Sequence, residues 1–443
     1  MPNFVPTSRE TTRHDFGAII KRGADRVRYR TTSDLSDISR DVAIVTDFIG
    51  QDEYRESLAA IGRSLNAKGF VTPFDDQAFA LELDLLNLEI LRAKTGGSFQ
   101  SLPEACHAGV DFLMGLGQTI PHLSANAKTR LLGRIRKGLN EGLWPLQHEF
   151  RIAAVLCKIG WDLYFHDLEE DGGYDFLATQ DGVSFEVEGK ATSIYTAWPI
   201  KPEDVTKLLV EVKERFSWDD PKTIPILSLK FASSLSPERT QLRELVSALT
   251  DVARTREEIF IPGVKIRSMG TIPDMPADKL LRASNAHSLM ARKTVVVNAE
   301  NPRIVLELDS NKPVQLAKKM LRTIRDAAKD QFSHSKPGVI WMHISMITDD
   351  IFKRLSSSHS GQASLLDRVA GAILLSQKRD YLSQLVFSGG SSLKKIPPVA
   401  YSSYGSVVYD SPHIRFGSDT IFPGGRKWPG RTKEKPTIGV QEA

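Results

Sequence analysis

The sequence predicts a mixed α/β protein in which an α-helical N-terminal region precedes a core of helix, three strands, helix and strand (αβββαβ) with a mixed sheet. Three observations lead to this expectation. Apolar residues recur at helical spacing through the first third of the chain, two short runs rich in Phe, Val and Tyr flank an Asp-Gly pair near the middle, and helical and strand patterns alternate beyond them. Such alternation is typical of α/β folds.

Composition places the chain among ordinary globular proteins. At 443 residues, with 41% hydrophobic and 25% charged residues, it is long enough for two or more domains and a substantial core. A net charge of +4 and a pI near 8.8 are compatible with nucleic acid as a partner but do not require it. The composition therefore excludes a wholly disordered chain and leaves the partner open.

The cysteines and the N-terminal sequence bear on the compartment. Cys106 and Cys157 are too few for a disulfide framework or, by themselves, a structural zinc site. The N-terminus lacks the apolar core of a signal peptide, and no apolar run approaches the ~18 residues that a membrane helix needs. We therefore expect a cytoplasmic protein with no membrane contact.

The first part of the chain, residues 1–140, is expected to be a helical domain. Apolar residues step by three or four from Tyr54 to Leu65, and a strongly apolar helix is expected from Ala80 to Leu91. Two more helices are predicted at 102–116 and 125–139, the second capped by Ser124. This second helix carries a dense set of basic residues, which either form a solvated face or meet a phosphate backbone: Lys128, Arg130, Arg134, Arg136 and Lys137.

The middle of the chain carries the predicted core. A helix between Gly142 and Gly160 has Pro145 near its start, which suits a first helical position. The elements expected after it are a strand at 161–165, an acidic loop at 166–173, strands at 174–179 and 183–190, a helix at 202–216 and a strand at 224–231. The pair Asp181-Gly182 has the residue types of a tight hairpin turn, so the second and third strands should be antiparallel.

The alternation continues to about residue 416, so we expect one α/β domain over 141–416. Further helices are predicted at 237–254 and 313–332, and further strands at 295–297, 304–308 and 339–345. The last segment, 417–443, is rich in Gly, Pro, Lys and Arg and is expected to be a mobile basic tail.

Charged residues gather on the third strand of the predicted core. Because side chains alternate along a strand, Glu186, Glu188 and Lys190 lie on one face, with Phe185 and Val187 on the other. Together with Asp175 on the preceding strand, this arrangement resembles the PD-(D/E)XK nuclease superfamily, also called the restriction-endonuclease-like fold. The resemblance covers residues 143–231, and Tyr174 stands where the motif's name has Pro.

The resemblance implies a set of roles. Asp175 and Glu188 would hold Mg²⁺, with Mn²⁺ as a substitute, and the Gly189 carbonyl would be a further ligand. Lys190 would orient the attacking water and offset charge in the transition state. Glu149 matches the place where many members carry an extra acidic residue near the metal; the alternative is a glutamate on a helix surface.

Two ambiguities concern the Glu-x-Lys pattern. Glu186 shares the face of Glu188, but only Glu188 has Lys two residues later, so Glu188 is favoured. A second match, Glu211-Val212-Lys213, lies within the predicted helix at 202–216. Residues two apart on a helix are separated by ~200° and cannot converge on one metal, so we exclude it.

Other signals are weaker. No histidine pair has metal-ligand spacing with a third ligand nearby, and no Gly-Gly pair is followed by Lys-Ser or Lys-Thr, so neither zinc nor ATP is expected. Tyr195 and Trp198 either stack on a base or pack in the core. One helix, predicted at 313–332, carries a basic stripe that either contacts nucleic acid or is solvated: Lys318, Arg322, Arg325 and Lys329.

The sequence thus predicts a Mg²⁺-dependent deoxyribonuclease, with RNA not excluded as substrate and a homodimer or a partner subunit as possible assemblies. A role in bacterial defence or restriction is implied only by how often the resembled fold serves it. The alternative is a nucleic-acid-binding or assembly protein that retains the fold without cleaving.

Overall fold

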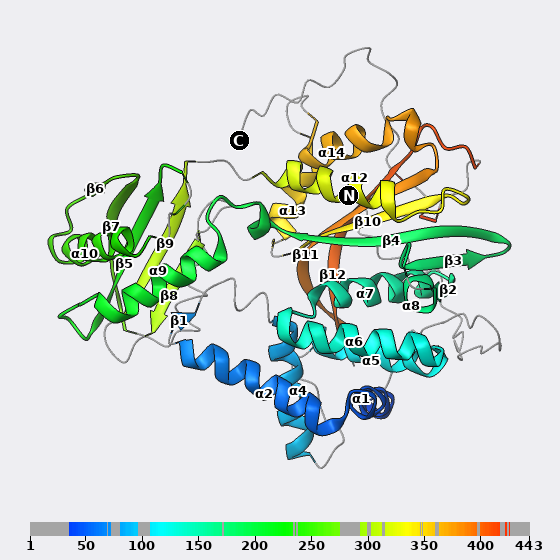
Figure 1. Cartoon of the computed structure of the whole chain (residues 1–443), viewed down its shortest axis with the longest axis horizontal. Helices are drawn as coiled ribbons and strands as arrows, with labels where there is room; N and C mark the ends of the chain where they lie inside the picture. Colours follow the sequence, from blue (N-terminus) through cyan, green and yellow to red (C-terminus); the bar gives the residue numbers. More distant parts are fainter. Residues whose placement is uncertain are drawn as a thin grey trace. The chain divides into compact units, whose positions relative to one another are not determined.

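The structure is a computed structural model. It describes residues 35–68, 70–71, 80–95, 107–170, 172–233, 235, 238–274, 293–298, 303–311, 315–345, 347, 349–358, 363–396, 399–416, 421–422 and 425. These residues form two compact units (Figure 1). Unit 1 takes the described residues within 1–59, 81–193 and 317–441, and unit 2 takes those within 60–80 and 194–316.

Helices make up the first part of unit 1, as the periodicity predicts. They are α1 (Leu35–Ile49), α2 (Gln51–Lys68, which runs on into unit 2), α4 (Ala80–Lys94), α5 (His107–Thr119), α6 (Ala125–Glu141) and α7 (Trp144–Lys158). The α6 helix begins where the sequence predicts, because the Ser124 hydroxyl accepts a hydrogen bond from the Ala127 amide. The start expected at 102 for the helix before it lies outside the described residues.

The domain boundary expected at residue 140 does not separate the two units. Helices on both sides of it, α6 and α7, lie in unit 1 and contribute to one core, in which Leu131, Ile135, Ile152 and Leu156 are fully buried. The residues after 193 divide between the units instead. Contiguous apolar periodicity shows that helices are present but not which core they share, so it cannot place a boundary between cores.

Unit 1 contains a mixed sheet in the order β12-β11-β10-β4-β3-β2. Its strands are β2 (Asp162–Phe165), β3 (Phe176–Gln180), β4 (Val183–Ser193), β10 (Gly338–Ser345), β11 (Leu382–Ile396) and β12 (Val399–Asp410). Strands β2, β3 and β4 form an antiparallel meander, β10 runs parallel to both β4 and β11, and β12 returns antiparallel to β11. The predicted hairpin is confirmed, with Gln180 opposite Val183 around the Asp181-Gly182 turn.

The expected composition of the core is wrong at its last two elements. The predicted helix at 202–216 and strand at 224–231 exist as α9 (Pro202–Arg215) and β5 (Thr223–Phe231), but both belong to unit 2 and β5 lies in a different sheet. The strand beside β4 is β10, reached through α12 (Leu316–Asp330). An apolar run predicts a strand, but the sheet it joins depends on long-range pairing.

Two layers of helix enclose the unit 1 sheet around β4. Helix α7 lies on one side and α12 on the other (Figure 1). The rings of Phe150, Phe165 and Phe176 pack between α7 and the first two strands. The Phe150 and Phe165 centroids are 5.6 Å apart with tilted rings, and Phe165 meets Phe176 edge to face at 5.0 Å. Two further helices, α13 (Asp349–Ser356) and α14 (Leu365–Leu374), pack on β11.

Unit 2 has its own sheet and its own core. Its strand order is β1-β8-β9-β5-β7-β6, formed by β1 (Phe70–Val71), β5, β6 (Ile259–Ile261), β7 (Val264–Pro273), β8 (Lys293–Asn298) and β9 (Arg303–Ser310). Helices α9 and α10 (Arg239–Thr255) cover one face, where Leu208, Leu249, Leu227 and Leu306 are fully buried. The helix and strands predicted at 237–254, 295–297 and 304–308 are therefore present.

Most of the tail expected at 417–443 lies outside the described residues. Two of its residues, Ile421 and Phe422, are buried. The Gln384 side chain accepts a hydrogen bond from the Phe422 amide at 3.0 Å and donates one to the Phe422 carbonyl at 2.8 Å. The chain is thus anchored on unit 1 at this point. No helix among the described residues has both the length and the apolar character needed to cross a membrane.

Candidate metal centre

The β3–β4 hairpin brings the predicted acidic residues together. Asp181 and Gly182 adopt φ values of 49° and 83°, the left-handed conformation that an Asp-Gly turn accommodates. The register places Phe176 opposite Val187, so Asp175, one residue earlier, lies at the level of Glu188. The local turn therefore determines which residues meet.

Asp175 and Glu188 are joined through main-chain amides. The Asp175 amide donates to Glu188 Oε2 at 3.1 Å, and the Gly189 amide donates to Asp175 Oδ2 at 2.6 Å. Both side chains are buried, and Lys190 Nζ forms an ion pair with Glu188 Oε1. The Gly189 amide thus holds the carboxylate of Asp175, while the role of its carbonyl as a metal ligand stays a prediction.

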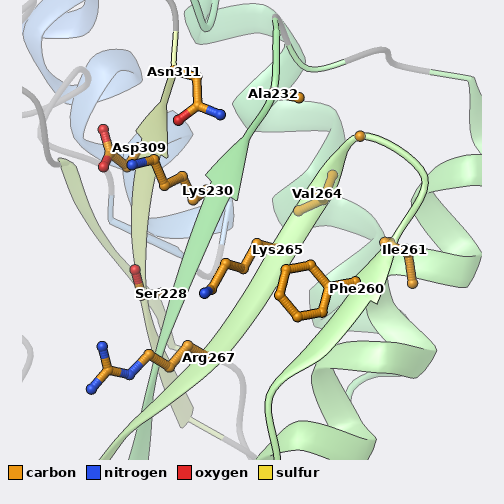
Figure 2. Close-up of a pocket in the computed structure, with 11 residues that line it drawn as sticks. Ser228, Lys230, Ala232, Phe260, Ile261, Val264, Lys265, Arg267, Asp309 and Asn311 are labelled. Carbon is orange, nitrogen blue, oxygen red and sulfur yellow. The ribbon is translucent and has the colours of Figure 1, made fainter.

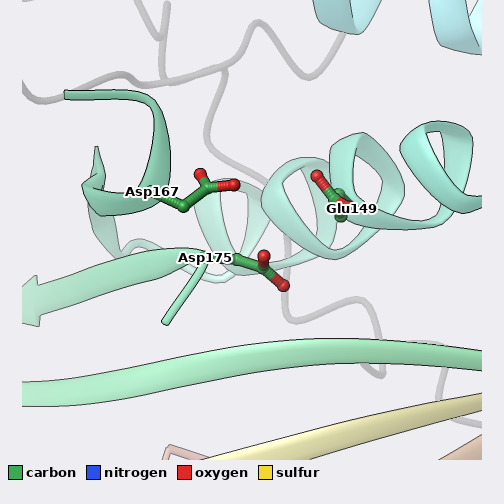
Figure 3. A group of neighbouring side chains, drawn as sticks. All are labelled: Glu149, Asp167 and Asp175. Carbon is green, nitrogen blue, oxygen red and sulfur yellow. The ribbon is translucent and has the colours of Figure 1, made fainter. Parts of the chain in front are cut away.

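Three carboxyl groups converge beside this hairpin. Ligand oxygens of Glu149 on α7, Asp167 and Asp175 lie within 4.8 Å of one another, and they form the one such group of three or more among the described residues. Figure 3 shows the three side chains entering the same space from separate elements. Glu188 is not part of this trio. The resemblance predicted Glu149 near the site but not Asp167.

Asp167 was missed because its segment was expected to be a loop. Its residues form the short helix α8 (His166–Glu169), anchored by the buried side chain of Leu168. Arg130 Nη1 donates to the Leu168 and Glu169 carbonyls at 2.6 and 2.9 Å, which satisfies carbonyls at the end of the helix. The cluster of acidic residues after His166 was the available signal, but nothing local shows which of them points inward.

Arg134, another basic residue of α6, forms ion pairs with two carboxylates of the acidic trio. Arg134 Nη1 lies 2.6 Å from Asp167 Oδ2, and Arg134 Nη2 lies 2.5 Å from Glu149 Oε1. Burial alone would lower the pKa of Arg134, but the two carboxylates raise it above its usual value. Elsewhere on α6, Arg136 pairs with Glu53 at 2.6 Å. Three of the five basic residues predicted on this helix, Arg130, Arg134 and Arg136, therefore bind carboxylates and carbonyls of this chain.

The electrostatics of the centre favour a cation. Burial, and then the charges of Glu188, Glu149 and Asp167, raise the pKa of Asp175 well above its usual range. Burial raises the pKa of Glu149 to about 7 even with Arg134 beside it. Burial also raises the pKa of Asp167 and of Glu188. The positive charges already present therefore leave these carboxyls incompletely compensated.

Lys190 remains a cation within this environment. Burial would lower the pKa of its ammonium, but Glu188 and Asp175 outweigh burial and raise it. Its side chain is 30% exposed, compared with 1% for Glu188. Lys190 is thus a charged group that borders on solvent at the edge of the acidic centre.

Two buried histidines lie beside the centre and were not predicted. His148 on α7 stacks on His343 of β10, with ring centroids 5.0 Å apart. Burial lowers the pKa of His148 to about 3 and that of His343 well below its usual range. The pair is therefore neutral near pH 7 and adds no charge beside Lys190. No local pattern predicts it, because the two residues are far apart in the sequence.

The alternate acid and the excluded motif have separate surroundings. Glu186 accepts hydrogen bonds from the Ser333 amide at 2.9 Å and from the Ser333 hydroxyl. Glu211 lies on α9 in unit 2 and pairs with Arg215 at 2.8 Å, so the prediction that this Glu-x-Lys match is helical is confirmed. Neither carboxylate belongs to the acidic trio.

The remaining predicted residues lie outside the acidic trio. Trp198 is buried in the core of unit 2, and the side chain of Tyr195 lies outside the described residues. The four basic residues of the stripe on α12 are all exposed: Lys318, Arg322, Arg325 and Lys329. On the opposite face of α12, Met320 and Ile324 are fully buried, so the predicted amphipathic helix is confirmed.

Similarity to other proteins does not identify the chain. No protein-family model, no curated protein and no solved structure shows a significant match to it.

Proposed function

We propose that the protein is a Mg²⁺-dependent nuclease that hydrolyses phosphodiester bonds in DNA and resembles the PD-(D/E)XK superfamily. The observation that carries the proposal is the placement of Asp175, Glu188 and Lys190 at one end of a hairpin, beside Glu149 and Asp167. Buried carboxylates next to an ammonium are the groups that metal-assisted phosphodiester hydrolysis requires.

The order of elements in unit 1 supports the resemblance. Helix α7 precedes the antiparallel strands β2, β3 and β4, and α12 then leads to β10, which lies parallel to β4. This is the expected order of helix, three strands, helix and strand, with residues 194–316 inserted between the third strand and the second helix. The insertion explains why the sequence assigned the nearer helix and strand to the core.

The residues of the trio fit a hard cation. All three offer carboxylate oxygens, the ligands that Mg²⁺ prefers. The pKa of Asp175 is raised by burial and then by the negative charge of its neighbours, which a cation would offset. A bound Mg²⁺ supplies charge neutralisation on the phosphate and a nucleophilic water. Arg134 holds Glu149 and Asp167 in place, so Asp175 is the residue of the trio with no ion pair to this arginine among the described residues.

Lys190 supplies the positive charge that the protein itself can direct at the substrate. Its ammonium is paired with buried Glu188 and is partly exposed, so it can donate to a water or to a phosphoryl oxygen at the edge of the site. A charge positioned in advance at the place where negative charge develops lowers the barrier without reorganisation.

Cleavage assays with matched variants test the proposal. We expect the full chain to cleave plasmid, linear duplex or single-stranded DNA with Mg²⁺ or Mn²⁺ but not with EDTA. Lys190→Gln keeps a donor to Glu188 and should lower the rate by about 10²-fold or more. Lys213→Gln, in the excluded Glu-x-Lys match on α9, is the matched control and should cleave like the original chain. Absence of metal-dependent cleavage on every substrate, including RNA, would contradict the proposal.

A second candidate function is nucleic-acid binding or assembly without cleavage. It is favoured by one observation: Arg134 pairs with Glu149 and Asp167, and Lys190 pairs with Glu188, so internal cations already partner three of the four carboxyls. In that case neither Mg²⁺ nor Mn²⁺ should bind at the trio. Isothermal titration of the full chain and of Asp175→Asn with Mn²⁺ separates the two functions.

A further inference from the structure

The sheet of unit 2 has one face covered by helices and one that lines a groove. On the covered face Leu227, Leu229 and Ile266 are buried under α9 and α10. The alternate residues of the same strands point the other way and line a groove of about 580 Å³ (Figure 2). Among its lining residues are Ser228, Lys230, Phe260, Lys265, Arg267 and Asp309.

The strand register places four of these residues in one row across the sheet. Phe260 on β6 is opposite Lys265 on β7, Lys265 is opposite Lys230 on β5, and Lys230 is opposite Asp309 on β9. Two lysines directly opposite each other on a sheet face destabilise it. Asp309 opposite Lys230 and Glu258 beside Lys265 offset part of this repulsion, and an anion bound between the two lysines would offset more of it.

Phe260 gives the row an apolar end. Its side chain is 68% exposed, and Lys265 Nζ lies 5.0 Å from the centroid of its ring. Glu258 pairs with Lys265 at 2.8 Å, which helps to hold the ammonium near the ring. An exposed aromatic ring bordered by cations offers a stacking surface next to a phosphate-binding surface.

The charge of the groove selects the class of ligand. Lys230, Lys265 and Arg267 line it, and the carboxylates beside them are those of Asp309 and Glu258. A ligand that complements both the cations and the ring needs negative charge and flat apolar groups in alternation. A nucleic acid strand has both, and its bases can stack on a side chain only where they are unpaired.

We propose that this sheet face of unit 2 binds single-stranded DNA. A base stacks on Phe260, and Lys230, Lys265 and Arg267 contact backbone phosphates. The choice of DNA as the strand rests on the proposed function, whereas the stacking and charge arguments rest on the groove itself.

Binding assays in EDTA test this surface without cleavage. The full chain is titrated into a fluorescein-labelled oligothymidylate of about 20 nucleotides, and binding is measured by the change in fluorescence anisotropy. Labelled duplex DNA and oligouridylate are titrated in the same way. Phe260→Ala should weaken binding to the DNA strand by about fivefold to 150-fold, and Phe260→Trp should restore it. The double variant Lys230→Gln, Arg267→Gln should have a shallower slope of log K against the logarithm of salt concentration. The magnitude of this slope should fall by about 0.7 for each phosphate contact that is lost.

Two substitutions on the solvent side of α9 serve as matched controls. Val210 is 42% exposed and the Lys207 side chain 57% exposed, so Val210→Ala and Lys207→Gln remove similar groups from the same unit without touching the groove. Both should bind DNA like the original chain. The proposal is overturned if Phe260→Ala binds as tightly as these controls, if duplex binding falls equally, or if the RNA strand binds more tightly than the DNA strand.

The outcomes separate this inference from the proposed function. If DNA binding depends on Phe260 but the chain does not cleave, the proposal for the groove is supported and the proposed nuclease function is refuted. If the chain cleaves DNA in a metal-dependent way but Phe260→Ala does not weaken DNA binding, the proposal for the groove is refuted and the proposed nuclease function is supported.

Discussion

Asp175 is the residue on which the candidate centre depends most. Its carboxylate is buried, accepts a hydrogen bond from the Gly189 amide and lies near the carboxyls of Glu149 and Asp167. Without a further cation the folded chain holds these groups close together at an electrostatic cost. That cost is expressed in pKa values, which link the site to the stability of the protein.

We expect the acidic centre of the metal-free chain to contribute less stability as the pH rises through its titration. The pKa of Glu149 is raised from its ordinary value of 4.5 to about 7, and that of Asp175 is raised well above 3.8. The carboxyls of the centre therefore bind more protons in the folded chain than in the unfolded chain between about pH 4 and 7, and their contribution to the free energy of unfolding falls across this window. Asp175→Asn should reduce this fall, measured by thermal melts in EDTA from about pH 4.5 to 8.

A buried carboxyl outside the centre provides the control. Burial raises the pKa of Glu82 to about 7, and its carboxylate accepts the Leu143 amide at 2.5 Å. Glu82→Gln should also flatten the pH dependence, but it should leave the stabilisation by Mn²⁺ at about pH 8 unchanged. Asp175→Asn should remove that stabilisation. If Mn²⁺ stabilises both variants equally, the trio is not the metal site.

At the scale of elements, the close approach of β4 to α7 depends on the absence of a side chain at Gly189. A Cβ there would lie 2.7 Å from Ile152 Cδ1, 3.1 Å from Asp175 Oδ2 and 3.8 Å from His148 Cδ2. Strand β4 can therefore lie this close to α7, which carries Glu149, and to the Asp175 carboxylate because position 189 has no side chain.

Gly189→Ala should destabilise the protein by about 1–3 kcal/mol, because overpacking a well-filled interface forces its neighbours apart. The nearest atom is the end of the Ile152 side chain, so Ile152→Val should relieve part of this strain. We expect the double variant to be more stable than the sum of the two single effects, by about 1 kcal/mol in a double-mutant cycle measured by denaturant unfolding. Additive effects would show that the contact with Ile152 is not the source of the strain.

At the scale of the whole molecule, each of the two compact units formed by the described residues has a hydrophobic core of its own. One surrounds α7 and the strands of unit 1, and the other lies between α9, α10 and the strands of unit 2. Most of unit 2, residues 194–316, is inserted between β4 and α12, so the chain leaves the first sheet at Ser193 and rejoins it at Gly338. A candidate centre in unit 1 and a DNA-binding groove in unit 2 would then be carried by separately packed parts.

Two matched core substitutions test this division. Leu156 on α7 and Leu229 on β5 are both fully buried, so replacing either by Ala should cost about 2–5 kcal/mol. We expect Leu156→Ala to lower one transition in calorimetry of the full chain and Leu229→Ala to lower another. A single transition that both substitutions shift equally would show that the two cores unfold as one.

Features that depend on neighbouring residues could be predicted from the sequence. The Asp-Gly turn determined the hairpin, the period of two placed Glu188 and Lys190 on one face, and the helical period excluded Glu211 as a ligand. The amphipathic pattern likewise predicted α12, and the Ser124 cap predicted the start of α6. These are local consequences of turn chemistry and side-chain direction.

Only the tertiary structure decided which elements share a sheet and which side chains meet. It assigned β10 rather than β5 to the place beside β4, and it brought Asp167 and Arg134 to the predicted acidic residues. It also placed His148 on His343 and aligned Lys230 with Lys265. These contacts join residues far apart in the sequence or on separate strands, and they form only when whole elements pack, so no local period or turn encodes them.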